Sequence, residues 1–255
     1  MTNWEVIRLS KEPALKNPVL IEGLPGIGNV GKITADFIIE ELKAKKLYSL
    51  FSYALPHSAF VNDDDLVELP RIEIYYKKMD RGSDILILTG DVQPTDEIST
   101  YSFCDTVLEI ARKFKVREIV TTGGIGLSEV PEKPKVYVTG NDKKLISWYA
   151  RGSSAHMGVH TVVGPIVGVS GILVGVAQLR GALAVTLLAE TFGHPLHLGV
   201  KGAREILRIF NLKLGLKLHL NKLTKEIDQL EQKTIKRTKE LNQLHGRINE
   251  TTYIG

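Results

Sequence analysis

The chain has 255 residues, of which 43% are hydrophobic and 24% are charged, as in a globular protein large enough to fold without a disulfide or metal staple. A single cysteine, Cys104, excludes an intramolecular disulfide and a cysteine-only metal site, which fits a cytoplasmic protein. The net charge is +4, and much of the basic excess lies beyond Lys213. This excess indicates a solvated helix face in preference to a nucleic-acid contact.

Hydrophobic patterns predict strands alternating with helices over residues 1–212. In chain order the pattern first predicts a strand at Val19–Glu22, a helix at Val30–Lys45, and strands at Leu47–Ala54, Leu66–Lys78 and Asp84–Thr89. It then predicts a helix from Thr95 or Asp96 to Lys113, strands at Val116–Thr122 and Lys135–Thr139, and a helix at Asp142–Trp148. The last predicted elements are a helix at Gly171–Arg180, a strand at Ala182–Leu188 and a helix at Gly199–Phe210. This alternation predicts an α/β fold of three layers, α/β/α, with a mainly parallel sheet.

Residues 213–255 follow a different pattern and form a second predicted domain. Apolar residues recur there with the 4-3-4-3 spacing of a heptad seam, which predicts a coiled-coil or helical-hairpin extension. Thr234 and Arg237 interrupt the seam. They would mark either a turn that folds the tail back or a polar layer that fixes the register of an oligomer.

One uncharged stretch, Met157–Leu179, has the length of a membrane span. Its glycines and Pro165 favour a buried loop followed by a core helix. Residues 1–10 lack the apolar segment of a signal peptide. No membrane association is therefore expected.

The segment Gly23–Lys32 lies between a predicted strand and a predicted helix. Gly26, Gly28 and Gly31 match the dinucleotide motif G-x-G-x-x-G, and Gly26, Gly31 and Lys32 match G-x-x-x-x-G-K. Glycines would let the backbone approach a phosphate, and the helix N-terminus would supply free N–H donors.

Both nucleotide motifs lack their confirming residue. The next strand ends without the acid that binds ribose hydroxyls, and Ile33 stands where a P-loop has the Ser or Thr that binds magnesium. A tight turn between strand and helix is the favoured interpretation, and no cofactor is predicted.

An enzyme or small-ligand binder remains the alternative function. Its candidate ligand loops contain Gly26, Gly28, Asn29, Gly31, Gly124 and Gly126, and its best lone acid is Glu190. A capping or hydrogen-bonding role for Glu190 is favoured. His156 and His160 have the four-residue spacing of helical metal ligands, but neighbouring glycines argue against a helix there. No catalytic residue or metal ligand is predicted.

The same segment carries a family resemblance. Gly-Leu-Pro-Gly-Ile-Gly-Asn-Val-Gly at residues 23–31 is similar to the opening of the proteasome assembly chaperone 2 (PAC2) family. The resemblance continues in order through the blocks at residues 54–57, 89–94, 121–126, 164–171 and 188–193.

This resemblance implies a fold like that of the nucleoside phosphorylases, assembly into homo-oligomers and no established enzyme activity. It also implies that the protein binds proteasome α subunits or the 20S ring without ATP, as an archaeal assembly-chaperone homologue. In the family, a C-terminal tail with a penultimate tyrosine docks between α subunits. Here the tyrosine is third from the end, so the candidate partner-binding residues are Tyr253, Ile254 and Gly255, and a frayed terminus is the other interpretation.

Overall fold

The computed structural model describes residues 4–221 and 223. Contacts divide the chain into two compact units, Met1–Leu218 and His219–Gly255. This division falls a few residues after position 212, where the sequence pattern changes. The extension is outside the described residues from position 224 on, so its coiled-coil or hairpin structure stays a prediction.

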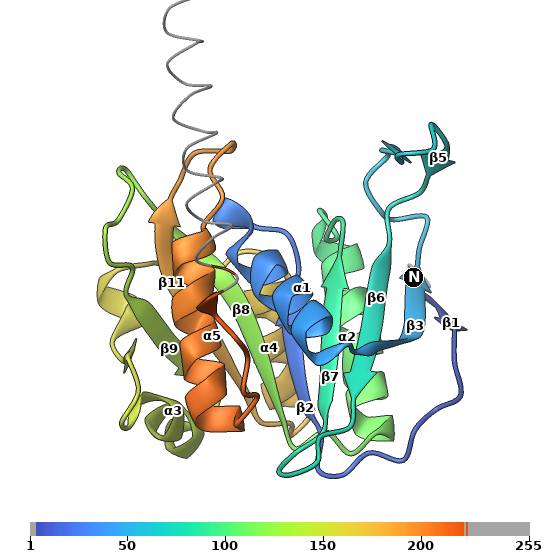
Figure 1. Cartoon of the computed structure of the whole chain (residues 1–255). Coiled ribbons are helices and arrows are strands. Elements are labelled where there is room, and N and C mark those ends of the chain that lie inside the picture. Colours follow the sequence, from blue (N-terminus) through green and yellow to red (C-terminus); the bar gives the residue numbers. More distant parts are fainter. Residues whose placement is uncertain (1–3, 222, 224–255) are drawn as a thin grey trace, which may run out of the picture. The chain divides into compact units, whose positions relative to one another are not determined.

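The first unit is built on a sheet whose nine described strands follow the order β1-β3-β6-β7-β2-β8-β11-β9-β10 (Figure 1). The central strands β7, β2, β8 and β11 are parallel to one another, whereas β6 and β9 join this centre in antiparallel fashion. The strands of the sheet are β1 (Glu5–Arg8), β2 (Val19–Gly23), β3 (Lys45–Phe51), β6 (Ile72–Lys77), β7 (Ile85–Gly90), β8 (Glu118–Leu127), β9 (Val136–Gly140), β10 (Ala155–His156) and β11 (Ala184–Phe192).

Helices cover both faces of this sheet. Figure 1 shows α1 and α5 on one face and α2 and α4 on the other, and these are also the helix pairs in contact. The helices are α1 (Val30–Leu42), α2 (Glu97–Lys113), α3 (Lys143–Ala150), α4 (Val169–Leu179) and α5 (Val200–Leu214). The predicted α/β fold with three layers is therefore confirmed, with a sheet that is parallel in its centre and mixed overall.

Local sequence explains where the main elements begin. Every residue of β2 is buried, as the continuous apolar run predicts for a strand covered on both faces. Asp96 caps α2, because its carboxylate accepts a hydrogen bond from Ser99 N at 2.9 Å. Asp142 caps α3 in the same way through Leu145 N.

The structure corrects the boundaries around the second glycine block. Gly123–Gly126 were expected in a loop after a strand, but they lie inside β8 and pair with residues 188–191 of β11. Likewise β11 continues to Phe192 and includes Glu190. Pairing with β11 keeps these glycines in the strand. Because they have no side chains, Ile27 can lie close to Gly124 and Gly126.

Two further departures come from weak apolar patterns. Strand β1 was not predicted, because all its residues are exposed. The predicted strand at Leu66–Lys78 is divided into β5 (Val67–Glu68) and β6, and β5 pairs with β4 (Phe60–Val61) to form a two-stranded arm. Among the described residues no helix is long and apolar enough to cross a membrane.

A buried polar pair fastens α3 to the start of β8. The Tyr149 hydroxyl donates to Glu118 Oε1 at 2.9 Å, and Arg117 forms an ion pair with the same oxygen. Burial, with the nearby Glu118 charge, raises the pKa of Tyr149 well above its usual value, so the hydroxyl keeps its proton.

We expect Tyr149→Phe to lower the free energy of unfolding by about 2 kcal/mol, because it removes a hydrogen bond to a buried carboxylate. Urea denaturation measures this, with Tyr101→Phe as the matched control because Tyr101 is half exposed. An equal effect of both substitutions would contradict the role of the Glu118 contact.

Candidate functional site

A buried carboxylate lies near the carboxyl end of β2, at the centre of the sheet. Glu22 is fully buried; its Oε1 accepts from Leu24 N at 2.9 Å and its Oε2 from the Ser170 hydroxyl at 3.1 Å. Burial raises the pKa of Glu22 to about 7, against the lowering effect of these hydrogen bonds. The carboxyl therefore titrates near neutral pH.

Threonines of β8 extend this polar cluster. Thr122 Oγ1 donates to Glu22 O at 2.8 Å, and Thr121 Oγ1 donates to Ser170 O at 2.8 Å. The Ser170 hydroxyl also lies 3.2 Å from Thr122 O. When Glu22 is protonated, its O–H can donate to Ser170, which frees the serine hydroxyl to donate to Thr122 O. The cluster thus joins β2 and β8 to the first turn of α4.

Gln93 links the loop after β2 to the same helix. Its Nε2 donates to Pro25 O at 2.7 Å, and its Oε1 accepts from Val169 N at 3.1 Å. Gly168, with φ of 88°, lets the amide approach, because a Cβ there would lie 2.6 Å from Gln93 Oε1. Protein groups satisfy both ends of this amide, so Gln93 positions the loops around the cluster.

The first glycine segment packs against the protein itself. A Cβ on Gly31 would lie 2.5 Å from Thr122 O, and one on Gly28 would lie 2.7 Å from Thr191 Oγ1. Gly28 also has φ of 61°, and its carbonyl accepts from Gly199 N at 2.7 Å. The surface beside these glycines is therefore filled by β8, β11 and the loop that follows β11.

Asn29 and Gly26 complete that segment. Asn29 precedes α1 with φ of 50° and makes no side-chain capping bond to the helix. Gly26 has no neighbour within 4 Å of its Cβ position. Of the predicted ligand residues in this segment, Gly26 is thus the one whose missing side chain leaves open space.

The structure brings the two predicted glycine segments together. A Cβ on Gly124 would lie 2.2 Å from Ile27 O, and one on Gly126 would lie 3.3 Å from Ile27 Cγ2. Ile27 belongs to the short 3-10 turn η1 (Ile27–Asn29) before α1. The glycines of β8 therefore form a groove that receives this turn, which explains both motifs through packing.

Glu190 takes part in strand pairing. Its Oε2 accepts from Lys135 N at 2.9 Å, and its Oε1 accepts from the Tyr137 hydroxyl at 3.3 Å. The carboxylate therefore holds the start of β9 against β11. The hydrogen-bonding role expected for Glu190 is present, and its small-ligand role stays a prediction.

The predicted partner-binding residues belong to the C-terminal extension. Tyr253, Ile254 and Gly255 lie outside the described residues, so partner binding by them stays a prediction. Within residues 4–221 and 223, no three His, Cys, Asp or Glu side chains gather as a metal would require.

Apolar side chains are exposed around the glycine segments at this end of the sheet, to which the arrow of β11 points (Figure 1). Val167 is 86% exposed and Leu196 is 76% exposed. They lie in the loops before α4 and after β11. We call the group Ile27, Val167, Leu196 and Leu198 the loop face. Exposed apolar groups that gather in one patch are typical of protein-binding surfaces, whereas singly exposed ones occur on most proteins. Periodicity could not reveal them, because they lie in loops.

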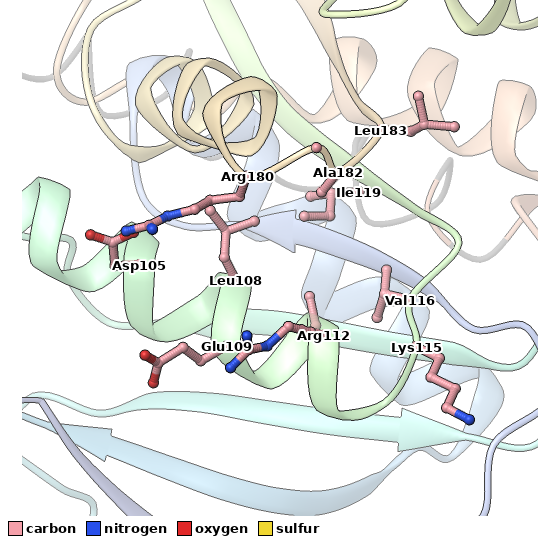
Figure 2. A pocket seen from close by; sticks show the side chains of 12 residues that line it. Asp105, Leu108, Glu109, Arg112, Lys115, Val116, Ile119, Arg180, Ala182 and Leu183 are labelled. Carbon is pink, nitrogen blue, oxygen red and sulfur yellow. The ribbon is translucent and has the colours of Figure 1, made fainter.

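A hollow of about 400 Å³ lies elsewhere, between α2 and α4 (Figure 2). Leu108 and Val116 contribute apolar surface, while Arg180 pairs with Asp105 at 2.8 Å. Figure 2 shows this pair at one end of the hollow and Lys115 at the other. Both signs of charge line the hollow, and none of the residues predicted from the sequence lies in it.

These features define a three-layer α/β protein whose central strands end in closely packed glycine turns surrounded by exposed apolar loops. The PAC2 family model matches residues 20–237. The chain belongs to the PAC2 family.

Known relatives and solved structures agree with this assignment. An uncharacterised protein of Methanocaldococcus jannaschii is 29% identical over 219 residues, which are 86% of this chain and 82% of that protein. The crystal structure of Pyrococcus furiosus PbaB, an archaeal proteasome activator, is 33% identical with a TM-score of 0.85 and covers 93% of this chain and 100% of PbaB.

P. furiosus PbaA, an archaeal homolog of proteasome-assembly chaperone, is 22% identical in its monoclinic form. Its TM-score is 0.74, with 98% of this chain and 99% of PbaA covered. At that identity the match supports the fold. The predicted family resemblance is confirmed.

Proposed function

We propose that the protein is a cytoplasmic, ATP-independent proteasome-binding chaperone without catalytic activity. In this proposal it acts as a homo-oligomer and contacts α subunits or the α ring of the 20S particle. The observation that carries the proposal is 33% identity to PbaB, described as a proteasome activator, over nearly the whole chain. The exposed loop face supplies apolar surface of the kind that protein partners cover.

The contacts of the glycine segments support protein binding over the small-ligand alternative. Gly28, Gly31 and Gly124 each face backbone or side-chain atoms of the same chain. A phosphate would have to displace β8, the turn before α1 or Thr191 to use these glycines. We therefore place the partner contact on the loop face.

Binding to purified α subunits and to assembled 20S particles tests this proposal. The full chain is expected to bind at least one of them, and Val167→Ser with Leu196→Ser is expected to weaken binding at least about tenfold, as for central apolar contacts of an interface. The matched control is Leu179→Ser with Leu183→Ser, which removes two exposed leucines at the opposite end of the sheet. The control is expected to bind like the full chain.

Two outcomes would contradict the proposal in different ways. Failure of the full chain to bind either target would overturn proteasome binding. Unchanged binding of the Val167 and Leu196 variant, with loss in Tyr253→Ala, would move the contact from the loop face to the predicted tail residues. Light scattering on the same samples measures the proposed homo-oligomer.

A further inference from the structure

A second concave surface lies at the amino end of β3, opposite the loop face. It encloses about 510 Å³ between the loop after β1, the end of α1, and the paired ends of β3 and β6. We call it the lysine hollow. Its lining residues are Lys11, Glu12, Pro13, Lys43, Lys45, Tyr76, Lys77 and Lys78.

The charge of this hollow is one-sided. Five of its lining residues are lysines, and Glu12 is the single acid among them. Glu12 Oε1 is already held by Lys113 Nζ at 2.6 Å and by the Tyr48 hydroxyl at 2.6 Å. In the described part of the chain, none of the five lysines forms an ion pair with a carboxylate. Like charges gathered in a concave surface attract an anionic partner.

The backbone at Lys43 has a left-handed conformation, which Lys115 and Lys217 also adopt. Lys43 ends α1 in the left-handed region, with φ of 50° and ψ of 52°, and its N–H bonds to Glu40 O at 3.1 Å. Helices usually place glycine at this position, because a Cβ is strained there. Local stability alone would favour glycine, whereas the chain places a fifth positive charge at the edge of the hollow.

The lining indicates which kind of anion fits. Sites for single-stranded nucleic acid combine positive charge with exposed aromatic rings on which bases stack. The lysine hollow has one aromatic residue, the half-buried Tyr76, and no arginine to grip a phosphate with two parallel hydrogen bonds. Its separate ammonium groups match separate carboxylates along a peptide.

We propose that the lysine hollow binds an acidic segment of a protein partner, with carboxylates of Asp or Glu paired to Lys43, Lys45 and Lys78. The hollow between α2 and α4 differs from the lysine hollow in its charge, because it contains acids as well as bases, including the Asp105–Arg180 ion pair. This second contact does not depend on the loop face. Its failure and the failure of proteasome binding are therefore measured separately.

Fluorescence anisotropy of a labelled ten-residue glutamate peptide with the full chain tests the proposal. We expect saturable binding that weakens with salt and that falls at least about tenfold in Lys45→Glu with Lys78→Glu. The matched control is Lys143→Glu with Lys144→Glu on α3. This control changes the net charge by the same amount, at exposed lysines outside the hollow. Its affinity for the glutamate peptide is expected to stay within about twofold of that of the unaltered protein.

Three results would overturn the proposal. These are no binding of the glutamate peptide, equal loss in the α3 control, and tighter binding of a single-stranded RNA of the same length. A ten-residue glutamine peptide is expected not to bind, and its binding would show that charge is not what the surface recognises.

Lys43→Gly separates binding from folding. We expect its Tm to rise by about 2–4 °C, because glycine relieves the strained backbone, while its affinity for the glutamate peptide falls about threefold through loss of one charge. A variant that folds more stably but binds less well cannot owe its weaker binding to unfolding. An unchanged affinity would overturn the assignment of Lys43 to the site.

Discussion

Gly31→Ala is expected to lower the free energy of unfolding by about 3 kcal/mol, although alanine normally stabilises a helix relative to glycine by about 1 kcal/mol. The added methyl group would lie 2.5 Å from Thr122 O and 3.2 Å from Leu24 O. Both atoms belong to backbone that cannot move without displacing β8 or the loop after β2. Helix propensity alone predicts that Gly31→Ala raises the stability, so a decrease would indicate close packing at this position.

Gly26→Ala is the matched control for this prediction. Gly26 has extended backbone, with φ of −165°, and nothing within 4 Å of its Cβ position. We expect its stability to stay within about 0.5 kcal/mol of the unaltered protein. Urea denaturation measures both variants, and a Gly31→Ala protein as stable as the control would contradict the packing role. If phosphate or a nucleotide stabilises the unaltered protein, and both Gly31→Ala and Gly26→Ala abolish that stabilisation, the result would support the small-ligand function.

Glu22→Gln is expected to change how stability depends on pH. The folded protein keeps the Glu22 proton up to about pH 7, whereas an ordinary glutamate loses it near 4.5. Between these values the folded state binds more protons than the unfolded chain, so stability falls as pH rises. The raised pKa corresponds to a loss of about 3 kcal/mol across this window.

Glutamine reproduces the protonated side chain, because its oxygen can accept from Leu24 N and its amide can donate to Ser170. The variant therefore does not lose stability as the pH rises. Its free energy of unfolding increases relative to that of the unaltered protein between pH 5 and pH 8. Urea denaturation at both pH values measures the difference. Glu109 is exposed, so Glu109→Gln is the control and is expected to show the same dependence of stability on pH as the unaltered protein. The same pH dependence in Glu22→Gln would contradict burial of a proton-binding carboxyl.

The sequence predicts the centre of the fold better than its edges. β2 and β7 are fully buried, and their continuous apolar runs mark them as strands. Strand β1 has exposed residues throughout, so no alternation distinguishes it from a loop. The family blocks follow the central elements, which is why they predict the fold correctly.

The candidate sites depend on contacts that a linear pattern does not contain. A glycine that faces a phosphate and a glycine that faces Ile27 O have the same letter, so the motif at Gly26–Gly31 could not distinguish them. The lysine hollow joins Lys11, Lys43 and Lys78 only after β3 pairs with β6. The loop face likewise depends on which loops meet at one end of the sheet.

The position of β11 has a consequence for how the chain is made. β11 lies between β8 and β9, although β9 precedes it in the sequence. During synthesis, β9 has no neighbour in the centre of the sheet until Ala184–Phe192 have emerged from the ribosome. The nascent chain must therefore keep the apolar edge of β8 uncovered while residues 128–192 are translated, a period in which such edges are prone to aggregate. A protein proposed to assist the assembly of others would in this interval depend on protection of its own unfinished sheet.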